Sequence, residues 1–111
     1  MEPIPPPTPV DVSVFEEGGV YILRTQDGMA LYRNDLDVDG KSHCVDSCSI
    51  LWPPFIASAD ATSVVGQWRT TQRGSARQWT YKGAPIYTYA KDTPGAQAGD
   101  GMAGVWHVLA P

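Results

Sequence analysis

Short stretches of alternating apolar and polar residues, separated by turns, run along most of the chain. Asp27-Gly28 and Lys82-Gly83 are turn signals, and each lies between two such stretches. The expected strands are residues 20–23, 29–34, 77–81, 85–89 and 106–109. One helical turn is expected within residues 58–65, and no segment has the pattern of an amphipathic helix of ten residues. The pattern predicts an all-β fold of mainly antiparallel strands.

The chain also repeats itself. A shift of 55 residues aligns Gly28, Tyr32, Asp37 and Gly40 with Gly83, Tyr87, Asp92 and Gly95. With one residue of slippage, Trp52 aligns with Trp106. We therefore expect one small domain, residues 12–111, built from two pseudo-repeats at about 20–66 and 67–111. Each repeat would bury the apolar side of the other.

Composition supports a single folded unit. The chain has 111 residues, of which 42% are hydrophobic, enough for one core and too many for a wholly disordered chain. Eleven Gly and ten Pro favour short strands joined by turns. The net charge is −4 and no basic patch occurs, which argues against nucleic acid and anionic membranes as partners. The longest apolar runs are too short to span a membrane.

The first residues differ from the rest. Residues 1–11 are rich in proline and predict either a stiff tether between the domain and a membrane anchor or a plain disordered terminus. Met1 is followed by no basic or apolar signal region. The protein is therefore expected either to be cytoplasmic or to have lost an export signal.

Cys44 and Cys48 are the two cysteines of the chain. In an oxidising compartment they are expected to form a disulfide, whereas in the cytosol such a pair suggests metal or redox chemistry. A copper or zinc site would combine them with His43 or His107. A thiol–disulfide catalyst is disfavoured because its usual spacing is Cys-x-x-Cys.

The segment from Asp35 to Asp46 resembles a calcium-binding loop in its spacing. Asp35, Asp37 and Asp39 alternate along the chain, Gly40 follows, and Asp46 takes the twelfth position. Against calcium, Asp46 stands where a bidentate Glu is usual, and no helices are expected on either side. The alternative is an acidic turn in which Asp37, like Asp92, caps its own loop.

The aromatic residues allow two interpretations. They could line a platform for a sugar or peptide, or they could pack in the core, which the alternation favours. The residues concerned are Tyr32, Trp52, Trp68, Trp79, Tyr81, Tyr87, Tyr89 and Trp106. No catalytic serine–histidine–acid arrangement, nucleophile elbow or phosphate loop is present, so we expect no enzyme.

Several of these segments together resemble a bacterial secreted-repeat family of predicted lipoproteins. The second half contains Tyr-x-Tyr-x-x-Asp at 87–92, which matches the family signature Tyr-x-aromatic-x-x-Asp. The first half contains Tyr32 and Asp37 at the same spacing, with Asn34 in place of the aromatic residue. Further matches are Gly-x-Ser-x-Cys at 40–44, Cys48, Trp-Pro-Pro at 52–54, Gly-Asp-Gly at 99–101 and Trp-His-Val at 106–108.

The resemblance implies an exported, β-rich protein, often held by a lipid anchor, with no established activity and no assigned catalytic residue. For an exported chain the Cys44–Cys48 disulfide is the favoured prediction. The predicted function is a non-enzymatic binding or structural module of the periplasm or cell surface, with an unknown ligand and no cofactor. The alternative is a metal-handling protein, with calcium in the Asp35–Asp46 loop or copper or zinc at the cysteines.

Overall fold

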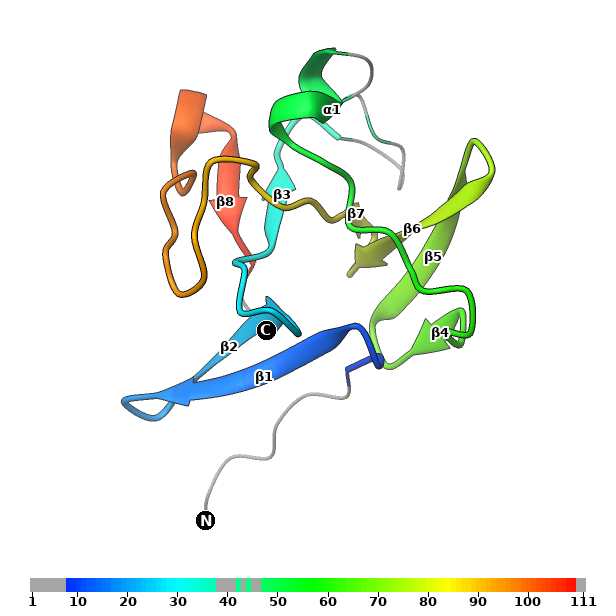
Figure 1. Ribbon diagram of the computed structural model, residues 1–111, viewed down its shortest axis with the longest axis horizontal. Helices are drawn as coiled ribbons and strands as arrows, with labels where there is room; N and C mark the ends of the chain where they lie inside the picture. Colours follow the sequence, from blue (N-terminus) through cyan, green and yellow to red (C-terminus); the bar gives the residue numbers. More distant parts are fainter. Residues whose placement is uncertain (1–7, 38–41, 43, 45–46, 110–111) are drawn as a thin grey trace.

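Antiparallel strands and their turns make up most of the computed structural model (Figure 1). It describes residues 8–37, 42, 44 and 47–109. The elements in chain order are β1 Val12–Glu17, β2 Val20–Thr25, β3 Tyr32–Asn34, α1 Ser47–Leu51, β4 Val64–Val65, β5 Trp68–Arg73, β6 Ala76–Tyr81, β7 Ala84–Pro85, the 3₁₀ turn η1 Met102–Gly104, and β8 Trp106–Val108. The all-β prediction is confirmed.

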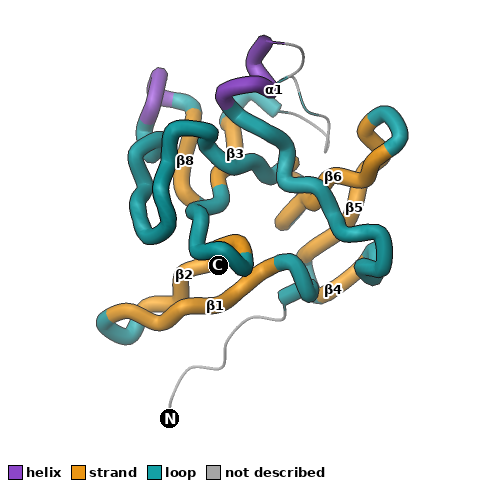
Figure 2. Tube along the Cα trace, viewed as in Figure 1, coloured by secondary structure: helices purple, strands orange, loops and turns teal. Residues whose placement is uncertain are grey.

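Three antiparallel sheets are formed by the described strands (Figure 2). The first contains β1 and β2, the second β3 and β8, and the third β4, β5, β6 and β7 in that order. The pairing of β3 with β8 joins the first half of the chain to its end. No helix in the described part of the chain is long and apolar enough to cross a membrane.

Both predicted turns are present, but the strands around them are shorter than expected. Lys82 and Gly83 have φ values of 51° and 85° and join β6 to β7, as a two-residue hairpin turn requires. The chain also reverses at Asp27-Gly28, as the antiparallel bridge between Arg24 and Ala30 shows. The pairing then stops, since the next strand, β3, pairs with β8 instead of returning along β2. The expected strand 85–89 likewise ends at Pro85.

The helical turn expected within residues 58–65 is wrong. This segment contains β4, and the Arg77 guanidinium binds the carbonyl groups of Ser58, Ala59 and Ala61, which a helix would need for its own bonds. The helical turn lies at α1 instead. Strands β1 and β5 were not predicted, because Glu and Gly near β1 and the Thr, Gln and Arg residues of β5 hide the apolar alternation.

The two repeats are related by pseudo-twofold symmetry. The β1–β2 hairpin corresponds to β5–β6, and α1 corresponds to η1. Equivalent backbone hydrogen bonds recur in pairs. These are Tyr32 N to Tyr87 O (2.8 Å) with its reciprocal (2.9 Å), Asp35 N to Val105 O (2.9 Å) with Ala90 N to Leu51 O (2.8 Å), and Leu109 N to Leu31 O (2.8 Å) with Phe55 N to Ile86 O (2.9 Å). The bonds run between the halves, so neither half is a separate lobe.

The start of the described chain is part of this unit. Pro9 is buried, and one carboxylate oxygen of Asp11 accepts hydrogen bonds from the Ser58 amide and the Trp79 indole, both at 2.9 Å. Pro9 and Asp11, which the sequence pattern assigned to the tether at residues 1–11, therefore contact the domain. Residues 1–7 are outside the described residues.

Candidate functional site: the crossed tyrosine–aspartate pairs

The two tyrosines that the 55-residue repeat aligns lie next to each other in the interior of the molecule. Tyr32 and Tyr87 form an antiparallel bridge, and each side chain has no exposed surface. Each tyrosine also pairs across strands with a second residue of the other repeat, Tyr32 with Val108 and Tyr87 with Pro54. The repeat positions that the sequence aligned are therefore equivalent in space.

The hydroxyl group of each tyrosine donates a hydrogen bond to the aspartate of the other repeat. The Tyr32 hydroxyl donates to Asp92 at 2.5 Å, and the Tyr87 hydroxyl donates to Asp37 at 2.6 Å. We call these contacts the crossed tyrosine–aspartate pairs. Asp92 also caps its own loop, because its other oxygen accepts the Ala98 amide at 2.8 Å. The sequence predicted this capping role but not the crossing.

A second polar group contacts each phenol oxygen. The Gly99 amide donates to the Tyr32 oxygen at 3.2 Å, and the Ser42 hydroxyl forms a hydrogen bond with that of Tyr87. Burial is the main cause that raises the pKa of both phenols, and the bonded carboxylate raises it further. Both tyrosines therefore keep their protons at neutral pH and act as hydrogen-bond donors.

The aromatic rings around the tyrosines form a stack that follows the same symmetry. Trp52 and Trp106 lie face to face with ring centroids 3.8 Å apart and planes 4° apart. Tyr32 contacts Trp52 edge-on at 5.1 Å, and Tyr87 contacts Trp106 edge-on at 5.1 Å. A second cluster of buried residues contains Trp68 and Trp79, whose side chains are fully buried. The prediction that these aromatic residues pack in the core is confirmed.

The two halves differ at the third signature position. Tyr89 stacks on Trp52 with centroids 4.5 Å apart. Asn34, its equivalent, is also buried, but its side-chain oxygen accepts the Leu36 amide at 2.8 Å. The polar residue thus caps the turn after β3 in place of adding a ring to the stack.

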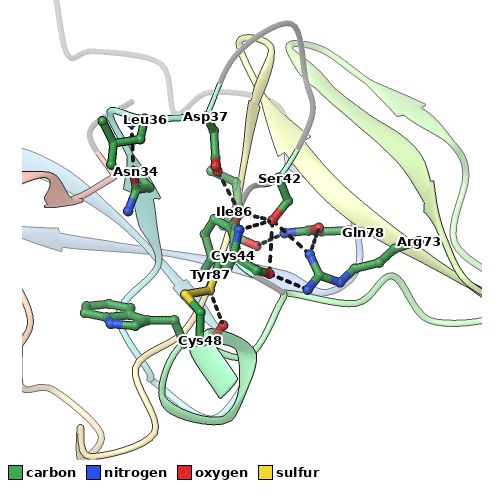
Figure 3. The surroundings of a disulfide bond; sticks show 11 residues. Asn34, Leu36, Asp37, Ser42, Cys44, Cys48, Arg73, Gln78, Ile86 and Tyr87 are labelled. Atoms are coloured by element: carbon green, nitrogen blue, oxygen red, sulfur yellow. Dashed lines mark hydrogen bonds between the residues drawn. A yellow bond between two sulfur atoms is a disulfide. The ribbon is translucent and has the colours of Figure 1, made fainter. Parts of the chain in front are cut away.

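Cys44 and Cys48 form the predicted disulfide, with Cα atoms 5.1 Å apart (Figure 3). The Arg73 side chain fastens this segment to β5. Its guanidinium donates to the Cys44 carbonyl at 2.5 Å and to the Ser42 hydroxyl at 2.9 Å. Both sulfur atoms are bonded to each other, so neither is a thiolate that could bind copper or zinc in this state. His43, the nearer histidine of that hypothesis, lies outside the described residues.

The acidic residues of the calcium hypothesis have different partners. Asp35 binds Arg33 and His107, each at 2.6 Å, and these contacts lower the pKa of its carboxyl group, His107 more than Arg33. Asp37 instead accepts a hydrogen bond from the Tyr87 hydroxyl. Asp39 and Asp46 lie outside the described residues. Within the described part of the chain, no group of three His, Cys, Asp or Glu residues is placed to hold a metal ion. Calcium binding stays a prediction.

Two contributors to this centre were missed from the sequence. Arg73 is a polar residue of an unpredicted strand, and nothing in its sequence neighbourhood points to the loop at 42–44. Gly99 lies buried in a turn, and a Cβ atom there would overlap the Trp52 ring. A signal existed for Gly99, because the 55-residue shift aligns it with Cys44, which is also buried.

A family model described as a secreted repeat of unknown function matches the chain twice, over residues 21–56 and 69–110. The matches cover more than half of the chain, and each includes one tyrosine and one aspartate of the crossed pairs. The chain belongs to this family. As a secreted repeat it is an exported protein, in agreement with the resemblance found in the sequence. No curated protein matches the chain, and no solved structure matches it.

Proposed function

We propose that this secreted repeat is a non-enzymatic module of the cell envelope, which serves as a rigid scaffold for binding or structural contacts outside the cytoplasm. The observation that carries the proposal is the placement of the signature side chains. Tyr32, Tyr87 and Asp92 are buried and bonded to one another's repeats, so they fasten the fold and do not face a substrate. What the family shares is then a way to join two repeats.

The disulfide supports the location outside the cytoplasm, because disulfides persist in oxidising compartments. The proposed location is the periplasm or the cell surface. The proline-rich residues 1–7 would act as the spacer between the domain and a lipid anchor. The proposed module needs no cofactor.

Cell fractionation of the protein in its native bacterium tests this proposal. We expect the protein in the envelope or secreted fraction, with both cysteines resistant to alkylation before reduction. Partition into a detergent phase would indicate the lipid anchor. The Cys44→Ser/Cys48→Ser variant is the control, since it accepts no alkylating reagent with or without reduction. Recovery from the cytosol with both thiols alkylated would contradict the proposal.

A further inference from the structure

The pseudo-symmetry shows that the two hairpins carry unequal numbers of partner strands. On the outer edge of β5, the strand β4 pairs antiparallel, with Val64 opposite Arg69 and Val65 opposite Trp68. The Thr70 amide adds a hydrogen bond to Ser63 at 3.2 Å. The equivalent strand of the other hairpin is β1. Among the described residues, no strand pairs with its outer edge.

The register of the β1–β2 hairpin identifies the groups on this open edge. Glu17 and Val20 flank the two-residue turn and form the last hydrogen-bonded pair of the hairpin. Counting back from this pair, every second β1 residue, including Phe15, bonds to β2 through its backbone. The backbone groups of Val14 and Glu16 consequently point away from β2. Unpaired groups of this kind form a ready template for another strand. Figure 1 shows the hairpin reaching out from the body of the molecule.

The chain's own N-terminal segment is poorly suited to fill this edge. A shift of 55 residues aligns β4 with Pro9 and Val10. Pro9 has no N–H group, and its carbonyl accepts the Val12 amide at 3.0 Å in a turn. Four more prolines precede it, at positions 3, 5, 6 and 7, so this sequence offers few of the donors that a paired strand needs.

The side chains along the edge indicate the chemistry of the partner. Phe15 and Val20 share the face of the hairpin that points away from the core, and they are 37% and 61% exposed. Glu16 is exposed on the opposite face and carries a negative charge. A strand added here would place apolar side chains beside Phe15 and basic ones beside Glu16. A second copy would instead bring more acidic residues, in a protein whose net charge is −4.

We propose that the outer edge of β1 is a docking site for an extended segment of a partner polypeptide, which adds as an antiparallel strand and alternates apolar with basic residues. Backbone hydrogen bonds from Val14 and Glu16 would supply affinity, and the flanking side chains would supply selectivity. The inference rests on the proposed function, since the natural partner of an exported module must itself be outside the cytoplasm.

The test uses the full chain, labelled with ¹⁵N, and a blocked synthetic peptide of alternating lysine and valine. We expect amide chemical-shift changes centred on Val14 and Glu16, with slower hydrogen exchange at these two amides. The same peptide with N-methyl groups on its protein-facing amides should not bind. Equal binding of the methylated peptide, shifts centred elsewhere, or no shift at millimolar peptide would overturn the proposal.

Two variants of Glu16 test separately the contribution of its backbone N–H and that of its side-chain charge to peptide binding. Glu16→Pro removes the outward N–H and the bond from the Gly19 amide to the Glu16 carboxylate, but no backbone bond between β1 and β2. It should abolish binding, whereas Glu16→Gln should retain it with lower affinity. Gln72→Pro is the matched control, because Gln72 occupies the corresponding outward position on β5, and it should bind as the original protein does. A dimer in light scattering, with Val14 and Glu16 protected before peptide is added, would overturn the proposal in favour of self-association. Failure here leaves the fractionation result unaffected.

Discussion

Tyr32 and Tyr87 each carry one buried hydroxyl group whose hydrogen bond joins the two repeats. A hydrogen bond to a charged acceptor contributes more than a neutral one, and a buried carboxylate that loses its donor keeps the cost of its desolvation. The edge-on contacts with Trp52 and Trp106 depend on the rings alone. Ring and hydroxyl can therefore be tested separately at both positions.

Tyr32→Phe and Tyr87→Phe keep the rings and remove the crossed hydrogen bonds. Each should lower the free energy of unfolding by on the order of 1.5–3 kcal/mol, as expected for bonds to charged groups. The measurement is urea denaturation followed by tryptophan fluorescence. Tyr81→Phe, at a buried position outside the crossed pairs, is the comparison. A large loss at only one of the two positions would contradict their equivalence.

The raised pKa values of these phenols predict sensitivity to alkali. In the unfolded chain a tyrosine ionises near its usual pKa of 10, whereas the folded protein holds Tyr32 and Tyr87 protonated above it. Their stabilising contribution is thus complete below pH 10 and is lost as the pH rises above 10. Unfolding free energies measured across this range should fall more steeply for the original protein than for the Tyr32→Phe/Tyr87→Phe variant. Equal slopes would contradict the prediction.

At the scale of the element, the helical turn α1 has a counterpart that needs no disulfide. The turn η1 occupies the equivalent place in the second repeat, where Gly99 aligns with Cys44. There the Gly99 amide bonds to Tyr32, and the absence of a side chain lets the backbone approach Trp52. The first repeat instead holds its segment with the disulfide and with Arg73. The two halves therefore hold the equivalent segment in place by different means.

Replacing both cysteines with serine should therefore loosen the 44–48 segment but leave the fold intact. The disulfide closes a ring of only five residues, for which the loop-entropy relation gives a stabilisation of about 2 kcal/mol. Thermal unfolding measures the loss, and a free-thiol assay on the unreduced original protein should find none. Loss of the whole fold in the double variant, or two titratable thiols in the original, would contradict this account.

At the scale of the molecule, the two repeats form a single folding unit. The strand pair β3–β8, the crossed tyrosine–aspartate pairs and the Trp52–Trp106 stack all join residues from different halves. A separated half would expose these rings to water and leave buried polar groups without partners. The contacts between these aromatic rings are thus made only when both halves are present.

Neither residues 8–66 nor residues 67–111 should fold alone. Each fragment should lack dispersed amide signals and a cooperative thermal transition, and mixing the two should restore both, because the contacts between halves are non-covalent. Fragments carrying Tyr32→Phe or Tyr87→Phe should recombine more weakly than the original pair. A monomeric, cooperatively folding fragment would contradict the single-unit interpretation.

Much of this architecture could be predicted because it depends on local chemistry or on repetition. Gly83 adopts a positive φ without steric cost, so the turn at Lys82-Gly83 could be predicted from local sequence. The 55-residue shift identified Tyr32 and Tyr87 as equivalent, and the spacing of Cys44 and Cys48 allowed their disulfide. The strands β1 and β5 were not predicted, because their polar residues lie at a sheet edge or bind a neighbouring loop. These residues interrupt the alternation of apolar and polar positions that marks a strand.

The sequence by itself therefore determined the β class, the two repeats, the disulfide and the aromatic composition of the core. Only the tertiary structure decided which aspartate each tyrosine binds, because a hydrogen bond between residues 60 positions apart leaves no local pattern. It also decided that β3 pairs with β8 and that Arg73 holds the Cys44 carbonyl. Partners of this kind are chosen by which surfaces can be buried together, and that choice is made by the whole chain at once.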